Sequence, residues 1–294
     1  MPLKVSFTKI FKNNDADLSA SHFGKNGSGD GVGYYNCLDA SQVTTKSVSL
    51  YGGNGSYAEN SLFGGLKGDY LYGGESANNN LLSGGGGDDY LYSGSIDLKS
   101  LGPKIGLDGG DGNDVLELSK NAANLLAARD IKSTQISVCG GNGRDTLKIF
   151  NAAEGQTIDL HQAVLAGKIS GVERISFESL STVNKTLIPP SKNTLTLQSS
   201  DISSLSQTID FFGDKSGRIT GPDAKLKQLV IDGDNKDVLS VTDTGWRLRE
   251  TVTSQSTENK SFVVYSNSSN MVELYVNSNI KVNLEANKTA SLIG

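Results

Sequence analysis

Long apolar runs and clusters of basic residues are both missing from this chain. It has no stretch of about 18 apolar residues, the length that a membrane-spanning helix needs. The start MPLKVSFTKIFKNNDADLSAS also has no apolar core of secretory type. The 27 lysines and arginines are outnumbered by 32 acids, which gives a net charge of -5. Since nucleic-acid binders neutralise phosphates with basic residues, the sequence predicts neither a membrane span nor a nucleic-acid partner.

Cysteine, histidine and proline are scarce. The two cysteines, Cys37 and Cys139, do not make a disulfide framework in 294 residues, and we expect free or only incidentally paired thiols. The two histidines, His22 and His161, lie far apart without an H-E-x-x-H or C-x-x-C pattern, which disfavours a zinc enzyme. Five prolines against 35 glycines indicate a chain with many turns.

Many of the glycines belong to a nine-residue repeat, G-G-x-G-x-D-x-U-x, in which U is apolar. The copies are GGLKGDYLY (64–72), GGGGDDYLY (84–92), GGDGNDVLE (109–117) and GGNGRDTLK (140–148). Longer variants at 52–63 and 73–83 place Asn60 and Asn80 where the aspartate is expected. In the copy that begins at Gly64, Lys67 stands at the fourth position, where glycine is expected, so we expect this copy to be distorted.

The residue types of this repeat suit a cation. Glycines at the first, second and fourth positions permit left-handed turns and leave carbonyl oxygens unshielded. The aspartate adds a carboxylate, and a set of oxygen ligands without thiol or imidazole selects calcium over zinc or copper. The closing x-U-x is a short strand whose middle residue points inward. These inward residues are Leu71, Leu82, Leu91, Leu116 and Leu147.

The repeat resembles the calcium-binding nonapeptides of the RTX (repeats-in-toxin) family. The resemblance implies a right-handed parallel β-roll, in which successive repeats alternate between two sheets and calcium ions lie in the turns. The implied ligands are Gly64, Asp69, Asn80, Gly84, Gly86, Asp89, Gly109, Asp111, Asp114, Gly140, Asn142 and Asp145. Insertions at 93–108 and 118–139 interrupt the repeats, and residues 121–130 have the pattern of a short helix.

Beyond about residue 150 the chain becomes rich in hydroxyl residues that alternate with apolar ones, which predicts strands. Residues 155–284 resemble the closing region of calcium-dependent adhesins that bacteria export by type I secretion. The segment IDGDNKDVL is a degenerate repeat, so Asp232, Asp234 and Asp237 form either a further calcium site or a polar turn between two strands. The end KTASLIG is compatible with an uncleaved type I secretion signal.

The expected fold is therefore all-β: a short parallel β-roll that continues into a strand-rich β-roll or β-sandwich-like C-terminal part. Three regions follow from the change in composition. Residues 1–50 are an irregular N-terminal cap, residues 51–150 the calcium-binding roll with insertions, and residues 151–294 the strand-rich region with the secretion signal at its end.

Four tyrosines flank two of the closing strands, at Tyr70, Tyr72, Tyr90 and Tyr92. Because these strands are two repeats apart, a two-sheet roll places them side by side with their tyrosines on one face. The rings then either bind a cell-surface glycan or a partner protein, or form a cross-strand aromatic ladder that stiffens the sheet.

Taken together, the sequence predicts a secreted, calcium-binding structural or adhesive module, located outside the cell or at the bacterial surface. Without calcium the stacked carboxylates repel one another, and calcium that binds only the folded state stabilises it. The alternative is a calcium-dependent extracellular enzyme, acting on polysaccharides or proteins, that carries the repeats. We do not expect an enzyme, since neither H-E-x-x-H nor G-x-S-x-G occurs. A pore-forming toxin would need a long amphipathic helical region, which is also missing.

Overall fold

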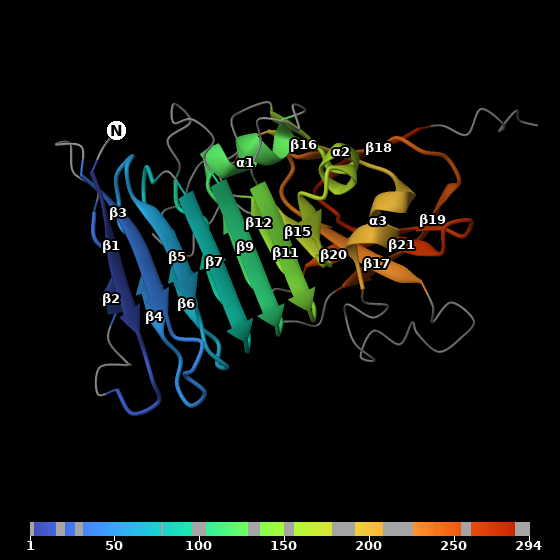
Figure 1. Ribbon diagram of the computed structural model, residues 1–294. Coiled ribbons are helices and arrows are strands. Elements are labelled where there is room, and N and C mark those ends of the chain that lie inside the picture. The colour runs from blue at the N-terminus through green and yellow to red at the C-terminus, as the bar shows by residue number, and fades with distance from the viewer. Residues whose placement is uncertain are drawn as a thin grey trace, which may run out of the picture.

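The computed structural model describes residues 3–15, 21–26, 32–77, 79–95, 104–128, 136–149, 156–177, 192–207, 226–253 and 260–285. Within these ranges the strands form sheets of seven, eleven and four strands, and three short helices accompany them. Figure 1 shows the strands of the N-terminal half side by side in chain order, from blue to green. The expected secretion signal at 288–294 lies outside the described residues.

The seven-stranded sheet is parallel throughout, in the order β1-β3-β5-β7-β9-β11-β14. Its strands are β1 (Leu3–Ile10), β3 (Val32–Asp39), β5 (Glu59–Phe63), β7 (Asn79–Gly86), β9 (Lys104–Asp111), β11 (Ile136–Asn142) and β14 (Ile169–Ser170). The first two glycines of three repeat copies lie near the ends of β7, β9 and β11, where Gly85, Gly110 and Gly141 pair in register.

The eleven-stranded sheet contains the closing x-U-x segments. Its order is β19-β20-β21-β17-β15-β12-β10-β8-β6-β4-β2, parallel from β21 to β2 and antiparallel in the β19-β20-β21 meander. The strands are β2 (Ser21–Phe23), β4 (Ser49–Tyr51), β6 (Tyr70–Tyr72), β8 (Tyr90–Tyr92), β10 (Val115–Leu118), β12 (Thr146–Ile149), β15 (Arg174–Ser176), β17 (Lys227–Asp232), β19 (Trp246–Thr253), β20 (Ser261–Asn267) and β21 (Val272–Asn277).

The chain alternates between these two sheets, and each pass through one strand of both sheets forms one coil. Leucines from both sheets meet in a single core between them. Leu71, Leu91, Leu116 and Leu147, the middle residues of four closing strands, are completely buried, and Leu82 in β7 is 2% exposed. The inward position of the apolar residue in each repeat is thereby confirmed, because a strand with one buried face alternates with a period of two.

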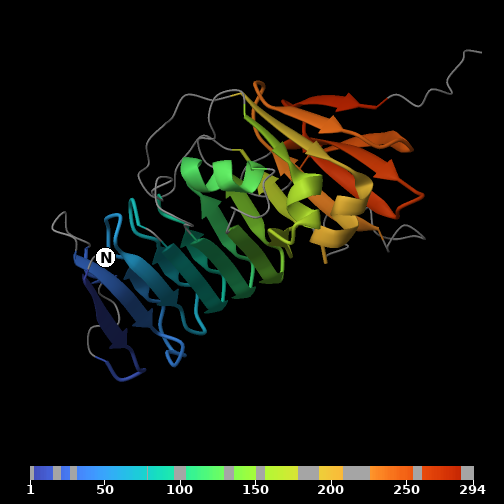
Figure 2. The same cartoon turned by 45° about the horizontal axis from the view of Figure 1, so that its top comes forward.

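The C-terminal half adds a parallel four-stranded sheet of order β13-β16-β18-β22. Its strands are β13 (Gln156–Asp159), β16 (Asn193–Leu197), β18 (Val238–Val241) and β22 (Lys281–Leu284). Figure 2 shows how these last strands, in yellow to red, continue the stack beyond β11. Leu195, Leu197, Leu239 and Val241 from this sheet belong to the same core as the leucines of the repeats.

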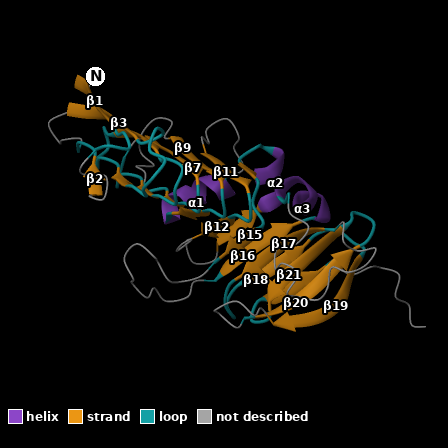
Figure 3. Ribbon diagram, turned by 90° about the horizontal axis from the view of Figure 1, so that it is seen from below, coloured by secondary structure: helices purple, strands orange, loops and turns teal. Residues whose placement is uncertain are grey.

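Three helices interrupt the strands of the described chain, namely α1 (Lys120–Ala127), α2 (Leu160–Leu165) and α3 (Ser199–Leu205). They follow one another along one side of the stack, as Figure 3 shows in purple. The Ser119 side chain accepts from the Ala122 amide at the start of α1, and the Asp159 side chain accepts from the Gln162 amide at the start of α2. Such side chains satisfy amides that a helix N-terminus leaves without partners. Among the described residues, no helix is long and apolar enough to cross a membrane.

The expected all-β fold is wrong. The structure combines long all-parallel sheets with helices, an arrangement closer to an α/β fold than to an all-β roll. The helix expected at 121–130 is present as α1, but the segments interpreted as strands around 156–177 and 193–206 also contain α2 and α3. These short segments are helical because their buried faces pack against the core. Secondary-structure propensity is a weak guide when it competes with such tertiary packing.

The sheets run across the region boundaries suggested by composition. Strand β3 pairs with β5 across residue 50, and β12 pairs with β15 across residue 150. The N-terminal 50 residues contribute regular strands to both sheets, with Phe11, Leu38 and Leu50 fully buried in the shared core. The first coils are thus built like those that follow.

Candidate metal site

A column of buried carboxylates runs along one edge of the stack, where the chain passes from the seven-stranded to the eleven-stranded sheet. Its members are the repeat aspartates Asp69, Asp89, Asp114 and Asp145, each at most 2% exposed. In every case the aspartate precedes an x-U-x strand, and the parallel pairing of β6, β8, β10 and β12 brings the four residues into line.

Backbone hydrogen bonds connect the column from one coil to the next. The amide of Asp69 donates to Oδ1 of Asp89 at 2.6 Å, and that of Asp89 to Oδ1 of Asp114 at 2.8 Å. The amide of Asp114 donates to Oδ1 of Asp145, also at 2.8 Å. One oxygen of each of these three acceptor aspartates therefore satisfies a backbone donor in the preceding coil.

The second carboxylate oxygen divides the column into two kinds of member. In Asp89, Asp114 and Asp145 the Oδ2 atom is buried and accepts no hydrogen bond. In Asp69, by contrast, Oδ2 accepts the Gly65 amide at 2.5 Å while Oδ1 accepts the Val48 amide at 2.7 Å. A buried acceptor without a partner is costly, so three carboxylates require either a proton or a cation.

The conformation of the second glycine explains this division. Gly85, Gly110 and Gly141 have φ values of 100°, 105° and 107°, in the left-handed region that favours glycine. Gly65, in the copy with Lys67, does not have a positive φ, and its amide reaches Asp69. The three copies that match the repeat fully are thus the three that leave a carboxylate oxygen without a hydrogen-bond donor.

A carbonyl oxygen accompanies each of these Oδ2 atoms. A Cβ atom on Gly84 would come within 3.0 Å of both Asp89 Oδ2 and the Gly109 carbonyl oxygen. Likewise, a Cβ atom on Gly109 would come within 3.0 Å of both Asp114 Oδ2 and the Gly140 carbonyl oxygen. Since the first glycine has no side chain, carboxylate and carbonyl oxygens converge beside it, and oxygens of these two kinds are the ligands that calcium prefers.

The electrostatics of the column disfavour bare negative charges. Burial, and then the charge of neighbouring carboxylates, raises the pKa of Asp89 to about 8. The same causes raise the pKa of Asp145 to about 7 and that of Asp114 to about 6. Burial also raises the pKa of Asp69. A divalent cation would compensate the charges that burial penalises.

Asn60 and Asn80, which the sequence places at the aspartate position of the repeat, lie at the opposite edge of the stack and bond to each other, and Asn60 also bonds to Asn36. Asn36, Asn60 and Asn80 are buried, with the Asn36 amide nitrogen 2.8 Å from Asn60 Oδ1 and the Asn60 amide nitrogen 2.7 Å from Asn80 Oδ1. Asn80 also bonds to the Gly74 amide and to the Gly74 and Ser93 carbonyls. All donors and lone pairs of Asn80 are in use, so this edge does not suit a cation.

The other predicted ligands of the repeats lie in the turns around the column. Gly64, Gly84, Gly109 and Gly140 are buried first glycines, whereas Gly86, Asp111 and Asn142 form one row in register across β7, β9 and β11. Asp111 and Asn142 are exposed, and the Asn142 amide nitrogen lies 2.8 Å from Asp111 Oδ1. These two side chains therefore bind each other at the surface, away from the buried oxygens.

Asp232 lies in an ion-pair network on β17. Its carboxylate contacts the Arg174 guanidinium, the Lys260 ammonium at 2.7 Å and the Asn277 amide nitrogen at 2.7 Å. Because two cationic side chains already compensate the charge of Asp232, this residue does not suit a calcium ion.

Asp234 and Asp237 form a turn between β17 and β18. Oδ2 of Asp237 accepts the Asp234 amide at 2.9 Å, and Oδ1 accepts from the Asn193 side chain at 3.0 Å. Asp234 accepts the Lys236 amide at 2.8 Å. This arrangement favours the polar turn that the sequence left open as the alternative.

Two residues of the site region escaped the sequence reasoning. Glu173 occupies the position of the column aspartate in the coil after Asp145, and its Oε2 accepts the Asp145 amide at 2.9 Å. The sequence contains a signal for this position, because Glu173-Arg-Ile-Ser matches the D-x-U-x part of the repeat with glutamate in place of aspartate. Asn36 was missed because no glycine repeat precedes it.

No group of three or more His, Cys, Asp or Glu side chains that would hold a metal by itself occurs among the described residues. Each candidate site in the column therefore has at most two such side chains and depends on backbone carbonyls for its remaining ligands. That dependence agrees with the glycines of the repeat, which leave those carbonyls accessible.

The four tyrosines occupy neighbouring strands, and Tyr70 and Tyr72 pair in register with Tyr90 and Tyr92. Their exposure differs, since Tyr70 is 51% exposed while Tyr90 is 9% exposed and donates its hydroxyl to Glu117 at 2.6 Å. The other two are intermediate.

The rings continue as a ladder toward the N-terminus. Tyr72 stacks on Tyr51 with centroids 4.6 Å apart, and Tyr51 stacks on Phe23 at 4.8 Å. Tyr51 lies between the rings of Tyr72 and Phe23, so its faces are not open to a sugar. The arrangement therefore favours the cross-strand aromatic ladder over a glycan-binding surface.

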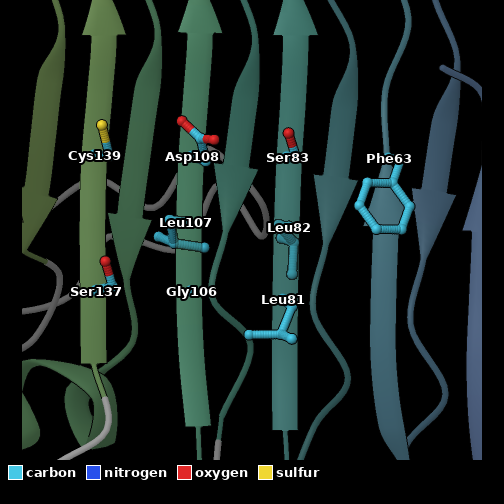
Figure 4. A pocket seen from close by; sticks show the side chains of 9 residues that line it. All are labelled: Phe63, Leu81, Leu82, Ser83, Gly106, Leu107, Asp108, Ser137 and Cys139. Atoms are coloured by element: carbon cyan, nitrogen blue, oxygen red, sulfur yellow. The ribbon is translucent and has the colours of Figure 1, made fainter.

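A shallow pocket lies on the outward face of the seven-stranded sheet, where Gly106 leaves a gap between larger side chains (Figure 4). Asp108 and Cys139 line it from neighbouring strands in register. No histidine is among its lining residues. Cys37 and Cys139 are both free.

Comparison with protein-family models, curated proteins and solved structures finds no match to this chain.

Proposed function

We propose that this protein is a calcium-dependent structural module in which Asp89, Asp114 and Asp145 each hold one ion. The observation that carries the proposal is the buried Oδ2 atom without a hydrogen-bond donor in these three residues, whereas both oxygens of Asp69 accept amides. Oxygen ligands from carboxylate and backbone suit calcium better than zinc or copper.

Ion binding and folding are coupled in this proposal. In the absence of ions, the column must either keep protons or separate its carboxylates, and the glycine-rich turns lose much conformational entropy on ordering. Each ion that binds only the folded chain adds about 2.7 kcal/mol of stability at a hundredfold excess over its dissociation constant.

The extracellular setting comes from the resemblance to RTX repeats. In that family a chain leaves the cell unfolded through a type I secretion machinery and folds when it meets calcium outside. Applied to this protein, the stacked coils of the two larger sheets would form a rigid adhesive or spacer element at the cell surface.

Calorimetric titration of calcium into chelator-treated protein, followed by far-UV circular dichroism, tests the proposal. We expect one ion per intact repeat copy and a gain of ordered β-structure in the wild type. A variant with Asp89, Asp114 and Asp145 changed to asparagine should lose both signals, because its neutral side chains bind calcium weakly.

The matched control is Asp237→Asn. Asp237 is also buried with a pKa raised to about 6, but both of its oxygens accept hydrogen bonds. This variant should retain the calcium stoichiometry of the wild type. A triple variant that still binds calcium like the wild type would refute the proposed sites.

A further inference from the structure

Glu173 bridges the aspartate column and helix α3. The residue is 1% exposed and both of its carboxylate oxygens accept backbone amides. Oε2 accepts the amide of Asp145 at 2.9 Å, and Oε1 accepts the amide of Gln207, just beyond the end of α3, also at 2.9 Å. A single buried side chain thus connects the last candidate ion site to the C-terminal end of a helix.

The backbone around Glu173 makes the same connection. The Val172 amide donates to the Leu205 carbonyl in the last turn of α3 at 3.2 Å. On the other side, a Cβ atom on Gly140 would come within 3.0 Å of both Asp145 Oδ2 and the Gly171 carbonyl oxygen. Residues 171–173 therefore contact the candidate ion site with one end and α3 with the other.

We propose that Glu173 couples ion binding at Asp145 to the stability of helix α3. The inference rests on the proposed function of the column. An ion at Asp145 that also uses the Gly171 carbonyl restrains residues 171–173, and the hydrogen bond from Gln207 to Glu173 passes this restraint to the end of α3. Coupling between two sites is reciprocal, so the loss of the bridge weakens ion binding by the factor by which ions stabilise the helix.

The variant Glu173→Gln removes half of the bridge with little change of shape. An amide has one oxygen and one nitrogen donor, so it cannot accept from both the Asp145 and the Gln207 amides. Glu273→Gln is the matched control, because Glu273 is a buried glutamate on β21 that bonds to Gln228 and Tyr275 rather than to the column.

The measurement is amide hydrogen exchange across residues 199–207, with calcium and with chelator, in the full chain. We expect calcium to slow exchange in α3 by about tenfold or more in the wild type and in the control Glu273→Gln, since hydrogen bonds to charged groups are strong. In Glu173→Gln we expect the calcium effect on α3 to disappear, while calorimetry still detects binding at Asp89 and Asp114.

A wild type that binds calcium without any change in α3 exchange overturns the coupling but leaves the proposed function intact. A wild type that binds no calcium overturns both. If Glu173→Gln does not fold, Asp145→Asn decides the matter, since it keeps the Glu173 bridge and loses the ion. Its α3 should exchange at the wild-type rate in chelator and fail to slow with calcium, and a normal calcium response would contradict the proposal.

Discussion

The backbone amide of Asp89 donates a 2.8 Å hydrogen bond to Oδ1 of Asp114, one coil further along the chain. The two oxygens of this carboxylate therefore differ in role, since Oδ1 accepts the amide of the neighbouring coil while Oδ2 remains without a donor and is available to a cation. A neutral asparagine can still accept the amide through its carbonyl oxygen, but it has no second, charged oxygen for the cation. For this reason asparagine, rather than alanine, is the informative substitution in the column.

The calcium-free protein should be more stable in mild acid than at neutral pH. The pKa of Asp89 is raised to about 8 and that of Asp145 to about 7, from an ordinary value of 3.8. Because the folded state binds more protons than the unfolded state, this stability is fully present below pH 3.8 and is lost as the pH rises to about 8. Urea unfolding at about pH 5 and about pH 8 in chelator measures the difference.

Calcium should reduce that pH dependence, because the ion replaces the protons that compensate the carboxylates. The variant with all three aspartates changed to asparagine supplies the control, since it has no raised carboxyl pKa at these positions. If the calcium-free wild type were more stable at the higher pH than at the lower one, the carboxylates of the column would not be protonated in the fold.

Gly110→Ala should destabilise the fold strongly. Gly110 has a φ of 105°, and a Cβ atom there would collide with the Gly85 carbonyl oxygen in the neighbouring coil. We expect a loss of more than about 1–2 kcal/mol in the free energy of unfolding, the usual cost of a left-handed conformation for a residue with a side chain. Chemical denaturation measures this loss.

Gly106→Ala, in the same strand β9, is the control for Gly110→Ala. The nearest atom to a Cβ on Gly106 is the end of the exposed Leu81 side chain at 3.0 Å, which has room to move. We expect the free energy of unfolding to change by no more than about 1 kcal/mol in either direction. Alanine loses less backbone entropy than glycine on folding, and this gain offsets the close contact with Leu81. Equal losses in both variants would mean that the turn conformation is not the cause.

Tyr72→Ser should weaken the aromatic ladder. Tyr72 stacks on Tyr51 with ring planes 6° apart and also approaches Tyr90, so its removal affects two ring contacts. We expect a loss of about 1–3 kcal/mol from buried area and ring contacts together. Tyr70→Ser, at an exposed ring with only a tilted contact to Tyr90, should cost less in the same denaturation experiment. A smaller loss for Tyr72 than for Tyr70 would contradict the ladder.

The sequence predicts those parts of the fold that repeat. The leucine of each x-U-x segment and the distorted copy at Lys67 follow from the nine-residue period, since a period of two within a strand fixes which side chain is buried. The helices of the C-terminal half do not follow from it. In α3, serines with low helix propensity depend on a buried face with Ile202 and Leu205, which only the tertiary structure supplies.

The sequence identifies the aspartates of the candidate site, but it only partly predicts which of them are free to bind an ion. The repeat identifies Asp89, Asp114 and Asp145, but a shared pattern does not reveal that the second oxygen of Asp69 is already hydrogen-bonded. That difference depends on the φ of Gly65, a conformational property. For Glu173, the segment Glu173-Arg-Ile-Ser matches only the second half of the repeat, and the stacked coils are needed to place this residue in the column.

Asn80→Asp distinguishes the two edges of the stack. If Asn80 were a weak calcium ligand, a carboxylate in its place would strengthen ion binding. The structure instead places its amide nitrogen 2.9 Å from the Ser93 carbonyl and 3.1 Å from the Gly74 carbonyl, so aspartate would direct a negative charge at two buried acceptors. We expect a loss of about 2–4 kcal/mol in the free energy of unfolding, because a charged group without donors is buried.

The calcium stoichiometry of Asn80→Asp, measured by calorimetry beside its denaturation curve, should remain that of the wild type. The substitution Asn79→Asp, at the partly exposed residue before it in β7, controls for the added charge and should change stability by less than about 0.5 kcal/mol. An additional bound ion in Asn80→Asp would show that the asparagine edge can also hold calcium. An unchanged stoichiometry with a destabilised fold would mean that the two edges of one stack have separate chemistry: carboxylates that bind ions on one side, and amides that bind each other on the other.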